Sequence, residues 1–275
     1  VGGMGLVACL ATRQSVAFAG IMTLIEVGGL VLIIAAGLGT GSDVVTRLPE
    51  ILPASGDIAA WVGLSGTTLI AVFAFIGFEH LVNVAEEMKD PSRTLPRALF
   101  TTLALTTVVY ALVVWIALMA VPPEELSRST APLALVFERL TGLPLVTMSM
   151  IAVVATLNGI IVHMIMIARV LYGLATQGNL PYALTRLNPT TRTPLLATAI
   201  GVGAILILAL AVPLAGLADL TARFTLAIFA IVNLALIRIK SREEEPPPGV
   251  FICPRWVPFA GLISSVALLL YRVAG

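Results

Sequence analysis

The chain has 275 residues, of which 59% are apolar and only 11% are charged, and its mean hydropathy is +1.04. Soluble domains carry about a quarter charged residues, so this composition excludes a soluble domain, a disordered segment and a nucleic-acid-binding protein. The two cysteines, Cys9 and Cys253, provide neither a disulfide framework nor the spacing of a metal site. The composition therefore predicts an all-α protein with several membrane-spanning helices.

Seven apolar stretches approach the length of about 20 residues that a helix needs to cross the hydrocarbon layer. They are Ser15–Leu38, Ala59–Ala85, Ala98–Val121, Pro144–Ala168, Leu195–Val212, Gly216–Ile237 and Val257–Tyr271. Their continuity argues against the alternating pattern of membrane barrel strands. The segment Val1–Ala11 looks like the tail of an earlier span, so we expect residues 1–275 to form one transmembrane domain that is part of a longer protein.

The distribution of Lys and Arg predicts the direction of insertion, because cytoplasmic loops carry the excess. Arg47, Arg128, Arg139 and Arg272 fall on one side, and Arg223 lies near the start of a span. The other side has Arg13, Lys89, Arg93, Arg97, Arg169, Arg186, Arg192, Arg238, Lys240, Arg242 and Arg255. The first full span is thus expected to run outward from the cytoplasm. The acidic and proline-rich run at residues 243–248 is expected to be a solvated cytoplasmic linker.

Few ionisable groups lie inside the apolar stretches, where a charge costs about 2.5 to 3.5 kcal/mol on insertion scales. Glu26 is followed by Gly28 and Gly29, which let another helix approach closely. Its carboxyl group can carry a proton or help to hold a cation, and the alternative is a structural acid hydrogen-bonded between helices.

The stretch Phe73–His80 places a glycine, an acid and a histidine among aromatic residues near the middle of a span. Transporters use helices that are interrupted at the bilayer midplane, where freed backbone groups bind the substrate. An interrupted helix is one interpretation of this stretch, and an ordinary aromatic packing stripe is the other.

A third polar group lies in the fourth predicted span, where His163 follows Thr156 and Asn158. A lone histidine among apolar residues is more often a hydrogen-bonded structural group than a ligand. Thr156 and Asn158 can offer oxygens to a small cation or can serve as polar contacts between helices.

Two sequence blocks resemble one family of transporters. Phe-Ala-Phe-Ile-Gly-Phe-Glu at residues 73–79, followed by Ala85–Ala98, strongly resembles the sixth helix and next loop of amino acid permeases of the amino acid-polyamine-organocation superfamily. The block from Arg169 to Pro194 resembles the end of the eighth helix and the loop to the ninth. Thr23–Leu30 and Cys253–Gly261 are more weakly similar to the fifth helix and to the entry to the eleventh.

This resemblance implies a LeuT-like fold with inverted repeats, of which the chain supplies about helices 5 to 11. It implies substrate binding by Phe73, Ala74, Phe75, Ile76 and Gly77, with Phe73 as a gating aromatic residue and backbone groups near Ile76 and Gly77 contacting an amino acid. It further suggests coupling or gating roles for Glu26, Glu79, Thr156 and Asn158. Some members carry a lysine where this chain has Glu26. No catalytic residue, metal or cofactor is implied.

We therefore expect a multi-pass protein of the cell membrane that transports amino acids by alternating access and is not an enzyme. Its partners are expected to be the amino acid, a coupling proton or an exchanged amino acid, and the lipid bilayer. The glycine-rich first helix of the family is missing from the sequence, so the chain alone is not expected to transport.

Two alternatives stay open. Gly63-Leu64-Ser65-Gly66 together with His163 matches a rhomboid-like intramembrane serine protease, which needs its serine hydroxyl within hydrogen-bond reach of the imidazole. The other alternative is a membrane channel or a scaffold that does not transport.

Overall fold

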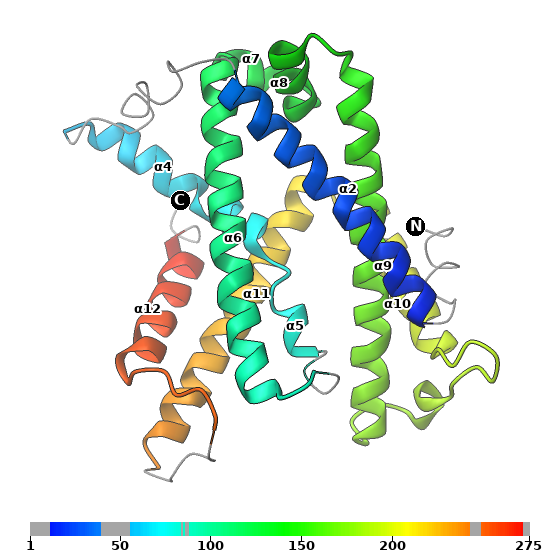
Figure 1. The fold of residues 1–275 in the computed structure, drawn as a ribbon. Helices are drawn as coiled ribbons and strands as arrows, with labels where there is room; N and C mark the ends of the chain where they lie inside the picture. Colours follow the sequence, from blue (N-terminus) through cyan, green and yellow to red (C-terminus); the bar gives the residue numbers. More distant parts are fainter. Residues whose placement is uncertain (1–11, 40–55, 84, 86–87, 243–248, 272–275) are drawn as a thin grey trace. The chain divides into compact units, whose positions relative to one another are not determined.

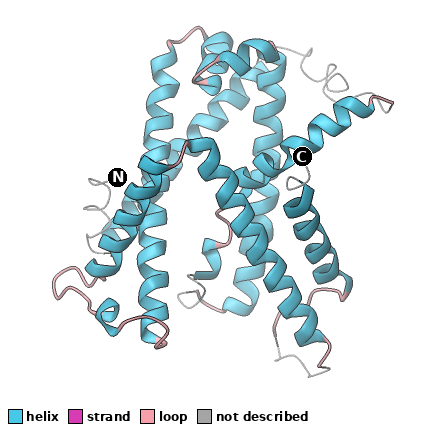
Figure 2. Cartoon of the chain, turned by 180° about the vertical axis from the view of Figure 1, so that it is seen from behind, coloured by secondary structure: helices cyan, strands magenta, loops and turns pink. Residues whose placement is uncertain are grey.

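The computed structural model describes residues 12–39, 56–83, 85, 88–242 and 249–271. These residues form helices, turns and loops and contain no strand (Figure 2), which confirms the all-α prediction. In chain order the elements are α2 (Thr12–Gly39), α4 (Ile58–Phe75), α5 (His80–Asn83), α6 (Pro91–Ala120), α7 (Pro123–Arg128), α8 (Pro132–Thr141), α9 (Leu145–Thr176), the 3-10 helix η3 (Tyr182–Thr185), α10 (Leu195–Ala211), α11 (Leu214–Lys240) and α12 (Trp256–Tyr271) (Figure 1).

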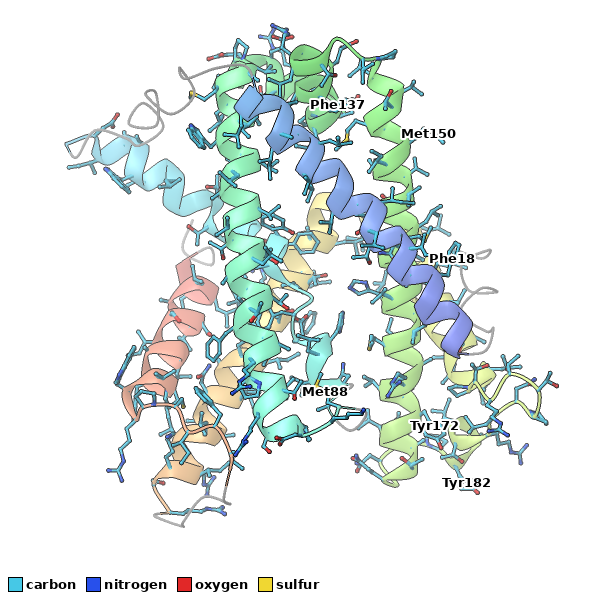
Figure 3. All side chains as sticks on the ribbon, in the orientation of Figure 1. Phe18, Met88, Phe137, Met150, Tyr172 and Tyr182 are labelled. Atoms are coloured by element: carbon cyan, nitrogen blue, oxygen red, sulfur yellow. The ribbon has the colours of Figure 1, made fainter. Side chains whose placement is uncertain are left out.

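The apolar helices follow the predicted spans. Among the described residues, Phe18–Gly39, Pro91–Ala120, Leu145–Thr176 and Gly216–Lys240 are long and apolar enough to cross a membrane. Ala71–Asn83, Leu195–Ala211 and Trp256–Leu270 are apolar but shorter. Large apolar side chains project from these helices; Phe18 is 42% exposed and Met150 is 60% exposed (Figure 3). Such surfaces suit contact with lipid tails, and the chain is a multi-pass membrane protein.

Several boundaries of the predicted spans are wrong. The span expected over Ala98–Val121 starts earlier, because α6 begins at Pro91 and includes Pro96. Proline fits the first helical position, where its missing N–H needs no partner. Between the spans expected over Ala98–Val121 and Pro144–Ala168 lie α7 and α8, each of which also starts at a proline. Helix α9 continues beyond Ala168 to Thr176.

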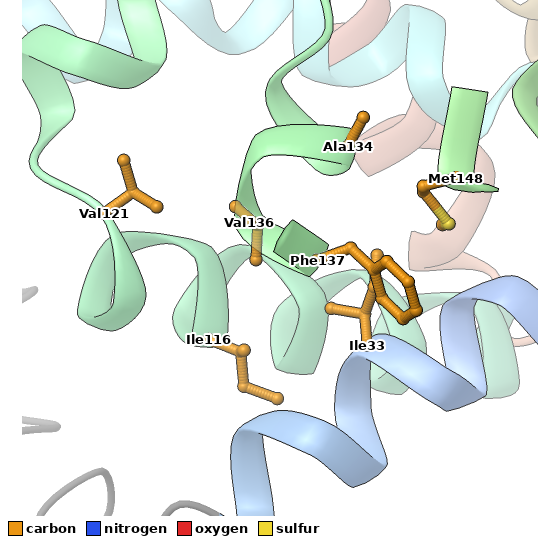
Figure 4. Packing of buried hydrophobic residues seen from close by; sticks show 7 residues of the cluster. All are labelled: Ile33, Ile116, Val121, Ala134, Val136, Phe137 and Met148. Atoms are coloured by element: carbon orange, nitrogen blue, oxygen red, sulfur yellow. The ribbon is translucent and has the colours of Figure 1, made fainter. Parts of the chain in front are cut away.

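The chain forms two compact units, residues 1–52 with 106–207 and residues 53–105 with 208–275. Each unit has its own hydrophobic core. In the first unit, Phe137 lies beside Ile33 (Figure 4), and the cluster consists of Ile33, Ile116, Val121, Ala134, Val136, Phe137 and Met148. In the second unit, Ala222 and Leu226 of α11 pack with Val72, Ile76, Leu268 and Leu269. The expectation of a single domain stays a prediction.

Helices α2 and α9 pack against each other in the first unit (Figure 1). The contact depends on Gly29, because a Cβ atom there would lie 2.9 Å from Cγ2 of Ile151 and 3.3 Å from Cε of Met148. Gly28 has no such neighbour within 4 Å. Of the two glycines that the sequence offered for a close helix approach, the structure uses Gly29.

We expect Gly29→Leu to lower the thermal unfolding midpoint of the full-length protein in detergent. A side chain forced into this contact costs about 1 to 3 kcal/mol. Gly28→Leu is the matched control, because the same side chain enters open space on the same helix. Equal midpoints for the two variants would contradict this account of the α2–α9 contact.

Candidate functional site

Helix α4 is interrupted inside the stretch that the sequence marked. Its last residue is Phe75, and Ile76 is extended with φ −65° and ψ 134°. Gly77 follows with φ +134°, a conformation that L side chains rarely adopt, and α5 begins at His80. The N–H groups of Ile76 and His80 bond to carbonyl groups three residues earlier, at 3.1 Å each. The regular helical ladder is therefore broken between α4 and α5 (Figure 1).

The acid beside the break belongs to its structure. Gly77 N–H donates to Oε2 of Glu79 at 2.7 Å. A carboxylate that accepts from a backbone N–H makes a charge-assisted hydrogen bond, which is stronger than a neutral one. Glu79 thus satisfies a backbone donor at the interruption, and both residues are partly buried.

The side chains near the helix break differ in their surroundings, since some are packed against α11 and others are exposed. Ile76 packs against the Ala222 and Leu226 core of α11, and the Phe78 ring lies 5.9 Å from that of Phe229. The aromatic packing interpretation thus holds for Phe78. Phe73 is 39% exposed, and Ala74 is also exposed. The Ile76 side chain is therefore part of this core, whereas the Phe73 ring is accessible.

A second polar site lies in the first unit, where Asn158 of α9 meets α2. Its Nδ2 donates to Oε1 of Glu26 at 2.8 Å and to Oγ1 of Thr23 at 3.0 Å. The Thr23 hydroxyl donates to the carbonyl of Ala19 at 3.0 Å, so it can only accept from Asn158. Both N–H donors of the amide are therefore directed to acceptors on α2.

The carbonyl oxygen of the Asn158 amide is hydrogen-bonded less completely than its nitrogen. Asn158 is only 5% exposed, and within the described part of the chain its Oδ1 is buried without a hydrogen-bond partner. An unsatisfied buried acceptor costs about 1 to 3 kcal/mol. Oδ1 of Asn158 can therefore accept one more hydrogen bond or contact a small cation, next to the carboxylate of Glu26.

The structure does not bring all predicted coupling residues together. Thr156 is exposed and its hydroxyl donates to Ala152 of its own helix. His163 is also exposed, and its Nδ1 lies 2.8 Å from the Gly159 carbonyl, as expected of a structural histidine. The described residues contain no group of three or more His, Cys, Asp or Glu side chains that could hold a metal ion.

Sequence reasoning missed the role of Thr23. Thr23 and Glu26 are three residues apart, a spacing that puts two side chains on one face of a helix. That spacing could have indicated a shared partner, but the partner's identity depends on how α2 and α9 meet. Ser65 lies inside α4, and its side chain is outside the described part of the structure.

Comparison with known proteins gives one family. Residues 1–274 match the family model described as amino acid permease. An uncharacterized transporter of Mycobacterium tuberculosis is 28% identical over 243 residues, which are 87% of this chain and 52% of that protein. A branched-chain amino acid permease of Bacillus subtilis is 28% identical over 211 residues, or 76% of this chain and 45% of that protein.

A vacuolar cationic amino acid transporter of Arabidopsis thaliana is 26% identical over 247 residues, which are 88% of this chain and 38% of that protein. The chain thus spans about half the length of these relatives or less. Because the family model covers nearly every residue, the chain belongs to the amino acid permease family.

Proposed function

We propose that the protein containing this chain is a secondary active transporter that moves amino acids across the cell membrane by alternating access. The observation that carries the proposal is the interrupted helix between α4 and α5, with Gly77 at φ +134°. An interruption in an apolar helix exposes backbone groups, which transporters use to bind the ionic ends of a substrate. Family membership supports the same function.

In this proposal Phe73, Ala74, Phe75, Ile76 and Gly77 form the chain's part of the substrate site. Phe73 contributes its accessible ring. Ile76 and Gly77 contribute backbone carbonyl groups, since their N–H groups bond to Phe73 and Glu79 and the Ile76 side chain is packed against α11. The named relatives include a branched-chain and a cationic amino acid transporter, so the proposed substrate class is amino acids, without a choice of side chain.

Coupling is assigned to Glu26 and Glu79, either to protons or within an exchange cycle. Each carboxylate accepts a hydrogen bond at a structural junction: Glu26 links α2 to α9, and Glu79 holds the Gly77 N–H within the helix break. A proton on either carboxyl group changes that bond, which is how proton binding can shift a conformational equilibrium. Asn158 assists Glu26. Thr156, whose hydroxyl bonds within its own helix, has the weakest support.

The alternatives receive less support. The protease interpretation rests on a short motif that includes Ser65, and the matched family is one of permeases. A channel or scaffold has no specific observation in its favour.

Uptake of radiolabelled amino acids by liposomes that contain the full-length protein tests the proposal that the protein is an amino acid transporter. The absence of any substrate-dependent uptake or exchange would contradict it.

For Phe73→Ala we expect weaker substrate binding, with a rise of about tenfold in the concentration for half-maximal uptake, because an exposed aromatic contact is lost. Phe229→Ala is the control, since Phe229 packs against Phe78 and is not part of the proposed site. Unchanged half-saturation in Phe73→Ala would remove Phe73 from the site.

Two variants separate the roles of Glu79. Glu79→Gln keeps an oxygen that can accept from Gly77 N–H but cannot carry a proton, whereas Glu79→Leu loses both properties. If Glu79 couples transport to protons, Glu79→Gln loses the stimulation of uptake by a pH gradient and still exchanges amino acids across the membrane. Undiminished stimulation in Glu79→Gln, with loss only in Glu79→Leu, would leave Glu79 with a structural role.

A glutamine variant also separates hydrogen bonding from proton binding at Glu26. We expect Glu26→Gln to retain the bond from Asn158 and to lose most pH-driven uptake, because the amide cannot be protonated at neutral pH. Ser149→Ala serves as the control on α9, since it removes a hydroxyl that bonds to Leu145 of its own helix and has no assigned role. Full pH-driven uptake by Glu26→Gln would exclude Glu26 as a proton carrier.

A further inference from the structure

Basic side chains gather at one end of the second unit. Arg238 and Lys240 lie in the last turn of α11, Arg242 follows that turn, and Arg255 immediately precedes α12. The three arginines are exposed and Lys240 is half-buried. The charge distribution of the sequence predicts that this end faces the cytoplasm.

Two contacts hold the connection between α11 and α12 in place. Lys240 Nζ donates to the carbonyl of Cys253 at 2.6 Å. The Phe251 ring packs edge-on against Phe100 of α6, with ring centroids 5.8 Å apart. Arg97 is exposed one turn before Phe100, a spacing that puts both on the same face of α6. The connection therefore brings the basic residues of α11 and α12 close to that of α6.

The same connection exposes apolar side chains. Phe251 is 53% exposed, Ile252 is 59% exposed and Trp256 is 68% exposed. Residues 250–254 are not helical, and irregular backbone does not occur in direct contact with hydrocarbon. Apolar and tryptophan side chains beside arginines are typical of the headgroup layer of a membrane.

These cations lack protein counter-ions in the described part of the second unit. The ion pairs there are Arg93 with Asp90 and Arg223 with Asp219, and neither involves the basic residues of the connection. Lys240 has three N–H donors, of which one is directed to Cys253. Glu243, Glu244 and Glu245 follow Arg242 in the sequence and lie outside the described residues.

We propose that this surface binds the phosphate headgroup of an anionic phospholipid in the cytoplasmic leaflet. We call it the headgroup surface and define it as Arg97, Arg238, Lys240, Arg242, Arg255 and Trp256. One guanidinium group can donate two parallel hydrogen bonds to the oxygens of one phosphate. The exposed aromatic and aliphatic side chains favour a phosphate attached to a lipid over a soluble phosphate. The proposal does not depend on transport.

The test is native mass spectrometry of the full-length protein in detergent with equal amounts of phosphatidylglycerol and phosphatidylcholine. The parent is expected to retain phosphatidylglycerol preferentially. Arg242→Gln with Arg255→Gln is expected to weaken that binding about tenfold, because two juxtamembrane charges are lost. Replacing the same two arginines by lysine is expected to restore most of it.

Arg186→Gln with Arg192→Gln is the matched control. It removes two exposed arginines from the same predicted side of the first unit and is expected to leave phosphatidylglycerol binding unchanged. An equal loss in the control pair, or no loss in the Arg242 and Arg255 pair, overturns the proposal. Displacement of the lipid by an equal concentration of glycerol 3-phosphate also overturns it, because the ligand would then be a soluble phosphate.

Salt dependence gives a measurement that needs no variant. Binding through exposed charges is screened by salt, so the preference of the parent for phosphatidylglycerol is expected to fall between about 0.05 and 0.5 M sodium chloride. A preference that stays constant over this range contradicts a headgroup site, even if the glutamine variants fail to fold.

Discussion

A helix that stops inside a membrane leaves backbone groups that hydrocarbon cannot satisfy, and each such group costs several kcal/mol. The break between α4 and α5 meets this constraint with its own residues. Glu79 accepts the Gly77 N–H at 2.7 Å, and Ile76 anchors the interrupted segment against α11. The position of an acid in this apolar stretch is thus explained by the backbone donor that it satisfies.

The first unit shows the same constraint in another form. Gly29 lets α2 approach α9, and the approach brings Asn158 within hydrogen-bond distance of Glu26 and Thr23. Two amide donors are satisfied and one buried acceptor, Oδ1 of Asn158, is not. A fully satisfied network fixes one arrangement, whereas one open position allows an added donor to change it. This incomplete network is the physical basis for assigning coupling to Glu26.

The sequence was sufficient for features that depend on local pattern. Continuous apolar runs predicted the helices, and the glycine, acid and histidine within Phe73–His80 gave an interrupted helix as one of two interpretations. The apolar pattern did not predict the helix starts at Pro91 and Pro132, which lie outside the continuous apolar runs. The Thr23 contact could not be predicted, because Thr23 and Asn158 are 135 residues apart and meet only through the rotation and approach of two helices. The functional roles came from family resemblance.

In the proposed function the interrupted segment contacts the amino acid, and hydrogen exchange of the full-length protein can detect this contact. Backbone amides within residues 73–82 are expected to exchange more slowly when a transported amino acid is added, because a bound ligand opposes the local opening of the hydrogen bonds around the break. Amides of α12 serve as the internal reference and are expected to stay unchanged. Unchanged exchange across residues 73–82 under saturating substrate would contradict the claim.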